Sequence, residues 1–248
     1  MPGYDRAVTI FSPNGHLLQV EYAQEAVRKG STVVAIRGEN CIVMGVEKRA
    51  ANHLQIKRTL RKIWVLDEHA ILAYSGLTAD ARIVINRAQV ECQSHRLNLE
   101  EPASLEYITK YIAAFKQKYT QSAGMRPFGL SCLIGGFDAD GMPHLFQTEP
   151  SGIYYEWRAN ALGRSANTVR AFLEKHFDSD KVQTEEATAK LAIRALLEVG
   201  QLVQKNLEIA VIRRNSTKTL YHPDIVSQYC DIINKEKLDE LIKLKPNK

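Results

Sequence analysis

The chain has 248 residues, of which 45% are apolar, and this composition fits a packed globular core and excludes a disordered or low-complexity protein. Its formal net charge of +5 comes from 33 basic and 28 acidic residues scattered along the chain, so no nucleic-acid footprint is indicated. No run of about 18 uncharged apolar residues occurs, so no membrane-spanning helix is predicted.

The chain begins with a predicted turn and a predicted helix. In residues 12–15, Ser-Pro-Asn-Gly, proline presets the backbone for a turn and glycine ends it. From about Val20 to Lys29 the apolar residues recur on one helical face, and Gly30 provides a residue that can end the helix. Short apolar runs at residues 32–36 and 41–46 then predict two strands joined by a hairpin and buried on both faces.

Two further hairpins and two strong helices follow. The hairpins pair residues 63–66 with 70–74 and residues 130–137 with 143–147. Between them stand two consecutive helical patterns, for which Thr78 and Ser104 are the predicted capping residues. Helices are predicted again near 167–177 and 185–203, then strands at 207–212 and 217–221, and a last helix from Asp224.

This order of elements predicts the class of fold. Helices in consecutive pairs between blocks of hairpins do not match the strict alternation of a doubly wound fold, and antiparallel sheets covered by helix layers fit better. No internal repeat or linker interrupts the chain, so residues 1–248 are expected to form one domain, with a charge-dense tail at about 236–248.

The usual catalytic and metal-binding motifs are missing from the sequence. It has no G-x-S-x-G, no P-loop and no HExxH, and its seven histidines show no metal-ligand spacing. Asp138-Ala-Asp-Gly141 starts like a calcium loop but lacks the later ligands, so a hairpin turn is predicted there. No metal and no cofactor are expected. Four widely spaced cysteines without a CxxC pair predict buried free thiols in a reducing compartment: Cys41, Cys92, Cys132 and Cys230.

The N-terminal residues carry the most specific pattern in the chain. Tyr4-Asp-Arg6 is followed by Phe11-Ser-Pro-Asn-Gly-His-Leu-Leu-Gln-Val-Glu-Tyr-Ala23, which resembles the N-terminal signature of proteasome alpha-type subunits. The resemblance continues through residues 76–82, 126–129, 149–152 and 205–209 and covers nearly the whole chain. Residues 91–97 and 119–122 are most similar to the family members at the fourth position of eukaryotic alpha rings, the alpha type-7 members.

The resemblance implies a fold and a function. The fold is an α/β (α+β) four-layer αββα sandwich of the N-terminal-nucleophile hydrolase class, with two antiparallel sheets between helix layers. The function is that of a non-catalytic structural subunit in the outer ring of the 20S core particle, in ubiquitin-dependent and ubiquitin-independent protein degradation. Its implied partners are the other alpha and beta subunits and the C-termini of regulatory activators, with no specific nucleic acid and no membrane. Cytoplasm and nucleus are the implied locations.

Catalytic relatives of this family use a free N-terminal threonine, whose hydroxyl is activated by the adjacent amine. Here Ser31 and Thr32 occupy that region, and the residues before them are retained in the family. The neighbouring nitrogen is therefore an amide of negligible basicity, so we predict no catalytic residue and interpret Thr32 as a β-branched strand residue.

The resemblance also implies two groups of functional residues. The first is a cluster that holds the axial gate in an ordered open arrangement, made by Tyr4, Asp5, Pro13 and Tyr22, with residues 1–30 as the gate segment and first helix. The second is an activator-docking pocket at the cleft between neighbouring subunits, in which Lys62 pairs with a terminal carboxylate and Gly15, Leu17, Glu21 and Gly76 line the walls.

Two other functions stay open on the sequence. An autonomous N-terminal-nucleophile amidohydrolase would require cleavage just before Ser31 or Thr32. A basic nucleic-acid-binding protein would use the loop at residues 57–62 and the basic C-terminus, although no aromatic residues alternate with these charges.

Overall fold

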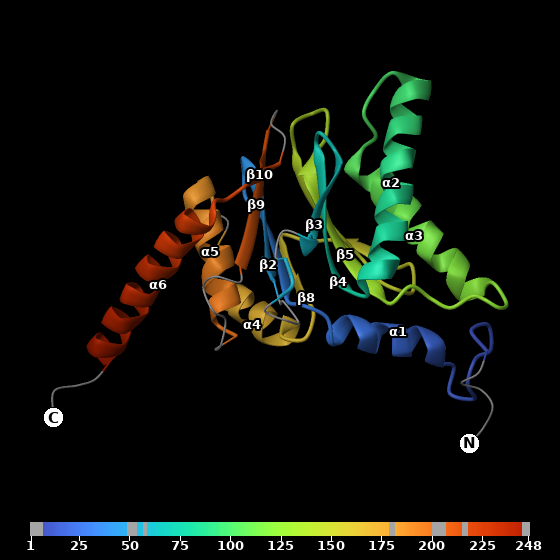
Figure 1. The fold of residues 1–248 in the computed structure, drawn as a ribbon, viewed down its shortest axis with the longest axis horizontal. Coiled ribbons are helices and arrows are strands. Elements are labelled where there is room, and N and C mark those ends of the chain that lie inside the picture. The colour runs from blue at the N-terminus through green and yellow to red at the C-terminus, as the bar shows by residue number, and fades with distance from the viewer. Residues whose placement is uncertain are drawn as a thin grey trace.

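The computed structural model describes residues 7–48, 54–56, 59–178, 182–199, 207–214 and 218–244, and for residues 238–244 it describes the backbone only. Within these residues two five-stranded sheets form the centre of the molecule, and every strand pairing is antiparallel (Figure 1). Sheet A has the order β10-β9-β2-β1-β8, with β1 Val33–Arg37, β2 Cys41–Glu47, β8 Ala159–Leu162, β9 Leu207–Arg213 and β10 Thr219–Leu220. Sheet B has the order β3-β4-β5-β6-β7, with β3 Ile63–Asp67, β4 Ala70–Gly76, β5 Leu130–Phe137, β6 Pro143–Thr148 and β7 Tyr154–Glu156.

Helices cover the outer face of each sheet. Sheet B packs against α2 (Thr78–Leu99) and α3 (Leu105–Gln121), and sheet A packs against α4 (Ala166–His176), α5 (Glu185–Leu197) and α6 (Pro223–Leu244) (Figure 1). The resulting order of layers is helix, sheet, sheet, helix, which confirms the predicted four-layer sandwich. The remaining helix, α1 (Leu18–Arg28), lies across one end of the sandwich and packs on β4 and β5.

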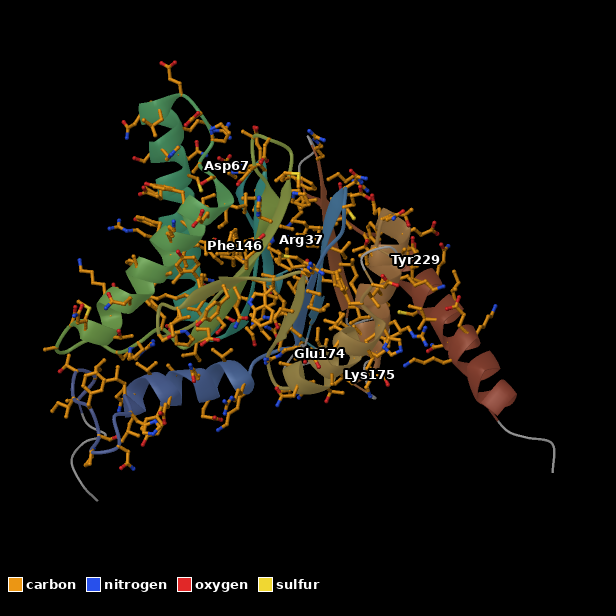
Figure 2. The ribbon with its side chains drawn as sticks, turned by 180° about the vertical axis from the view of Figure 1, so that it is seen from behind. Arg37, Asp67, Phe146, Glu174, Lys175 and Tyr229 are labelled. Atoms are coloured by element: carbon orange, nitrogen blue, oxygen red, sulfur yellow. The ribbon has the colours of Figure 1, made fainter. Side chains whose placement is uncertain are left out.

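Three apolar clusters hold the four layers together. The cluster between the sheets takes alternate residues of the central strands, such as Val33 and Ala35 of β1 and Ile71 and Ala73 of β4. The intervening residues face the helices, so strands with a helix layer on one side and a second sheet on the other are buried on both faces. Phe146, labelled in Figure 2, belongs to the cluster under α2 and α3.

Most predicted elements are confirmed, including all three hairpins and the Ser104 cap, whose hydroxyl accepts a hydrogen bond from Tyr107 N at 3.2 Å. The prediction that Thr78 caps α2 is wrong, because Thr78 is the first helical residue and the residue before it is Leu77. The sequence analysis also missed β7 and β8, which are only three and four residues long.

Two helices in the C-terminal part of the chain end at other residues than predicted. The helix expected at 185–203 ends at Leu197, and residues 200–206 lie outside the described residues. The helix α6 continues to Leu244, into the segment expected to be a charged tail, and residues 245–248 lie outside the described residues. All four cysteines are buried and free, as predicted.

Candidate functional site

The segment before α1 forms the predicted turn. Gly15 N donates to Ser12 O at 2.8 Å, and Gly15 has φ +80°, a left-handed backbone conformation that favours glycine. The turn is joined to the helix by a contact of 2.5 Å between His16 Nδ1 and Glu21 Oε1. Leu17 immediately precedes α1, so three of the predicted pocket residues lie together on this turn and the first turn of the helix.

The predicted gate cluster is described only in part. Pro13 is an exposed residue of the same turn, and Tyr22 on α1 is 52% exposed. The described residues provide no hydrogen-bond partner for the Tyr22 hydroxyl. Tyr4 and Asp5 lie outside the described residues. Whether the four side chains meet stays a prediction.

Lys62 stands one residue before β3, with its amine near the start of α2. Its Nζ lies 3.4 Å from Thr78 Oγ1 and 4.5 Å from the centre of the Tyr74 ring. Burial lowers the pKa of the Lys62 amine. Within the described part of the chain no carboxylate lies within 4 Å of it, so its charge is balanced only by a hydroxyl dipole and an aromatic face.

Gly76 holds the end of β4 close to β5. Its φ is +117°, and a Cβ atom there would lie 2.1 Å from Gly129 O, so no other residue fits without moving the backbone. Leu77 N donates to the same oxygen at 3.0 Å. The start of α2, including Thr78, is therefore fixed against the first residues of β5.

A buried carboxylate strengthens this junction. Asp80, in the first turn of α2, accepts two hydrogen bonds from Arg126, at 2.6 and 2.7 Å, and one from Gly129 N at 3.0 Å. Burial raises the pKa of the Asp80 carboxyl, but these hydrogen bonds together lower it by more, and the net pKa lies below its ordinary value.

The predicted pocket residues thus form two groups. Lys62 and Gly76 lie at the junction of sheet B with α2, and Gly15, Leu17 and Glu21 lie at the start of α1. Among the described residues no hydrogen bond or ion pair joins the two groups. Sequence reasoning missed Thr78 and Tyr74 as the neighbours of the Lys62 amine, because spacing along the chain does not show which side chains meet it. Thr78 lies in the 76–82 motif, but it was predicted to be a helix cap.

Thr32 immediately precedes β1 and is fully buried. Its Oγ1 has no hydrogen-bond partner among the described residues, and Thr32 O accepts from Glu47 N at 3.0 Å. The preceding residues are tied to the sandwich, since Ser75 Oγ donates to Val27 O and to Ser31 O. Among the described residues, no base contacts the Thr32 hydroxyl, a contact that an activated nucleophile requires.

A cavity of about 460 Å³ lies between α1, α4 and the ends of the sheets. Its lining is polar and includes Gln24 and Arg28 of α1, Ser131 of β5, Glu149 and Arg164. The Arg164 guanidinium donates hydrogen bonds to Glu47, and Gln24 donates to Glu149.

The described residues contain no group of three side chains suited to a metal. The Asp138–Gly141 segment, which starts like a calcium loop in sequence, is a hairpin turn in which Gly141 N donates to Asp138 O at 2.8 Å.

Comparison with known proteins gives the family. The family model for the proteasome subunit matches residues 27–212, and the model for the N-terminal signature of A-type proteasome subunits matches residues 4–26. The chain belongs to the proteasome alpha-subunit family. It is 64% identical to proteasome subunit alpha type-7-1 of Drosophila melanogaster over 99% of this chain and 98% of that protein, and 57% identical to proteasome subunit alpha-type 8 of Homo sapiens over the same shares.

Membership fixes the general role of this alpha-type protein. It is a structural subunit of the alpha ring of the 20S proteasome, and it assembles with other alpha and beta subunits into the core particle that degrades proteins. Alpha-type subunits are generally non-catalytic members of this protease complex. The predicted relation to the alpha type-7 members is confirmed by the relatives. Among the described residues no helix is long and apolar enough to cross a membrane.

Proposed function

We propose that this subunit contributes to the axial gate and to the docking of activators, and that it has no peptidase activity of its own. In this proposal residues 1–248 form one domain, residues 1–30 provide the gate segment and first helix, and the particle works in the cytoplasm and nucleus. Neither specific nucleic acid nor membrane is a partner. The observation that carries the proposal is the Lys62 ammonium, which lacks an acidic partner within the described residues.

A carboxylate supplied in trans would complete the surroundings of Lys62. Thr78 and Tyr74 hold the amine in place but leave its charge uncompensated, so pairing with a chain terminus would not break an existing ion pair. Gly76 and the Asp80 junction keep the start of α2, and so Thr78, in a fixed position. Pre-ordering of this kind lowers the entropy lost on binding.

Lys62→Ala in assembled particles should weaken the binding of a monovalent activator C-terminal peptide at this subunit. A desolvated charge pair is worth about 2 to 5 kcal/mol and a rim pair less than about 1 kcal/mol, so a half-buried amine should give a loss of about tenfold or more. Photo-crosslinking of the peptide, with quantification of the labelled subunit, measures the effect. A monovalent peptide is needed because a whole activator engages several sites and its avidity would mask one loss.

Lys175→Ala is the matched control, because Lys175 is an exposed lysine in the last turn of α4, a helix that packs on β8 of sheet A and not on the junction of β4 with α2. It should leave crosslinking unchanged. Lys62→Arg should rescue only in part, since a guanidinium is broader than an ammonium. Equal crosslinking to wild-type and Lys62→Ala particles, or none to this subunit in either, would contradict the docking role.

Thr32→Ala should leave every peptidase activity of the assembled particle essentially intact. Its hydroxyl is buried and follows an amide nitrogen, so it cannot act as an N-terminal nucleophile. Fluorogenic peptides for each cleavage specificity measure this, and loss of one whole specificity would argue for the amidohydrolase alternative. An intact mass that keeps residues 2–30 argues against that alternative independently.

Tyr22→Phe should reduce the peptide hydrolysis that activators stimulate, if the Tyr22 hydroxyl stabilises the open gate. The side chain is half exposed on α1 and free of intrachain hydrogen bonds within the described residues, so it is available to a neighbouring gate segment. One hydrogen bond is worth on the order of 1 kcal/mol, or about fivefold in the open population. Unchanged stimulation would remove Tyr22 from the gate.

A further inference from the structure

Lys116 of α3 is fully buried against sheet B and plays no part in the proposed function. Its Nζ donates to Thr148 Oγ1 at 2.9 Å, to Leu130 O at 3.2 Å and to Thr148 O at 3.3 Å. The fourth neighbour of the same nitrogen is Cys132 Sγ, at 3.5 Å. Lysine is among the residues least often buried completely, and here it lies beside an equally buried thiol.

The backbone fixes the relative positions of Lys116 and Cys132. Cys132 on β5 is directly opposite Thr148 on β6, so the two side chains stand on the same face of sheet B and point toward α3. Lys116 reaches down from α3 onto that pair. The nitrogen and the sulfur are therefore held in contact by two neighbouring strands and one packed helix, and not by a flexible surface loop.

The other three cysteines have no such partner. Burial raises the pKa of Cys41, and it raises the pKa of Cys92 to about 12 and of Cys230 to about 11. Carboxylates lie near Cys92 and Cys230 and raise the pKa further. A thiolate is the reactive form of cysteine, so these three thiols are expected to be inert. Cys132 differs from them in its geometry, because a lysine nitrogen lies in direct contact with its sulfur, at 3.5 Å.

We propose that Lys116 and Cys132 form a modification site, at which hydrogen peroxide converts the contact into a reversible covalent sulfenamide bond. The Cys132 thiolate attacks peroxide, the O–O bond breaks, and the sulfur becomes a sulfenic acid. The released hydroxide takes a proton from the Lys116 ammonium and leaves as water. The lone pair of the neutral amine then attacks the sulfur, the S–O bond breaks, and a second water leaves with a proton from nitrogen.

The balance is one peroxide consumed, two waters released and one S–N bond formed, with cysteine oxidised by two electrons. Sulfenic acids condense with a nearby nitrogen or thiol when one is within reach, and otherwise oxidise further. Here no second thiol contacts Cys132 among the described residues, while the Lys116 nitrogen does. Reduction by a thiol restores both side chains, and peroxide is small enough to enter during local opening of the helix layer.

The test uses intact 20S particles treated with hydrogen peroxide, followed by denaturing mass spectrometry of this subunit. The expected result is a loss of about 2 Da and a linked peptide pair that joins Lys116 to Cys132, both reversed by dithiothreitol. The peptides carrying Cys41, Cys92 and Cys230 should stay unmodified in the same sample. Trypsin should also fail to cleave after Lys116 until the reductant is added.

Two variants separate the linkage from ordinary thiol oxidation. In Cys132→Ala particles the 2 Da loss should disappear, and in Lys116→Met particles Cys132 should gain about 16 or 32 Da instead. The wild-type peptide map keeps the test valid if either variant fails to assemble. An unmodified Cys132 after treatment, a wild-type gain of 16 Da or more at Cys132, or a linkage of this thiol to another residue would each overturn the proposal.

Discussion

Replacing Lys116 by alanine should lower the free energy of unfolding of this subunit by about 3 to 5 kcal/mol, measured by denaturant titration in reducing buffer. The change removes a long buried side chain and leaves a cavity between α3 and sheet B. It also takes away the donor that three oxygens of Leu130 and Thr148 share. Each buried acceptor left without a donor costs about 1 to 3 kcal/mol, and the cavity adds its own loss of packing.

Two further variants make the Lys116 prediction specific. Lys118→Ala changes an exposed lysine two residues along the same helix and should alter stability by less than about 0.5 kcal/mol. Lys116→Met keeps most of the volume and removes the cost of burying a charge, so its loss should be smaller than that of alanine. A loss below about 1 kcal/mol in Lys116→Ala would mean that the amine contributes little to packing.

The Lys116 amine also predicts a pH dependence. Burial lowers its pKa in the folded chain, whereas the unfolded chain keeps the ordinary value near 10.5. Between the lowered folded pKa and 10.5 the unfolded chain binds more protons, so the contribution of Lys116 to stability rises as pH rises through this window. The difference in stability between wild type and Lys116→Met should therefore shift in favour of wild type as pH increases, and a flat difference would contradict this assignment.

Asp80→Ala is expected to have the second largest effect on stability, a loss of about 2 to 4 kcal/mol. The carboxylate is 4% exposed and accepts hydrogen bonds from Arg126 and from Gly129 N, so its removal leaves the buried Gly129 amide without an acceptor. The Arg126 guanidinium is 63% exposed and remains hydrated, which reduces the cost below that of a fully buried pair. For the same reason Arg126→Ala should cost less than Asp80→Ala.

The Asp80 variant links stability to the proposed docking site. Asp80 fixes the first turn of α2 against the loop before β5, and Thr78 in that turn contacts Lys62. Peptide crosslinking at Lys62 should therefore also fall in Asp80→Ala particles. A variant that loses stability but keeps full crosslinking would show that the position of the Lys62 amine does not depend on this junction.

The Asp80 carboxyl should also make the stability of the subunit depend on pH in the acid range. The pKa of Asp80 is lower in the folded chain than in the unfolded chain, so its stabilisation is complete above the ordinary value near 3.8 and is lost as pH falls through the lowered folded pKa. Asp80→Asn cannot titrate, and its stability should fall less steeply than that of wild type below pH 3.8. Parallel acid-unfolding curves for the two proteins would count against this.

Sequence reasoning predicted the hairpins, the consecutive helix pairs and the buried cysteines. Short apolar runs bounded by turn residues, and apolar residues that recur on one helical face, can be recognised in a local stretch of sequence. Sequence reasoning failed at β7 and β8, whose three and four residues are too short to show a period, and β8 is recognisable as a strand only through its pairing with β1. It also failed at Thr78, a residue type that suits a helix cap. In the fold that side chain instead contacts the Lys62 amine.

The sequence by itself determined the family, through motifs read along the chain, and it predicted antiparallel sheets covered by helices, through the order of its periodic segments. The four-layer sandwich was what the family resemblance implied. The sequence also predicted that Lys62 and Gly76 belong to one docking pocket, but it did not predict the side chains that contact the Lys62 amine. Only the tertiary structure decided that Lys62 lacks an acidic partner among the described residues, that Asp80 supports the adjacent turn, and that Lys116 contacts Cys132. These contacts join residues on different strands and helices, and packing of the layers, not spacing along the chain, brings such residues together.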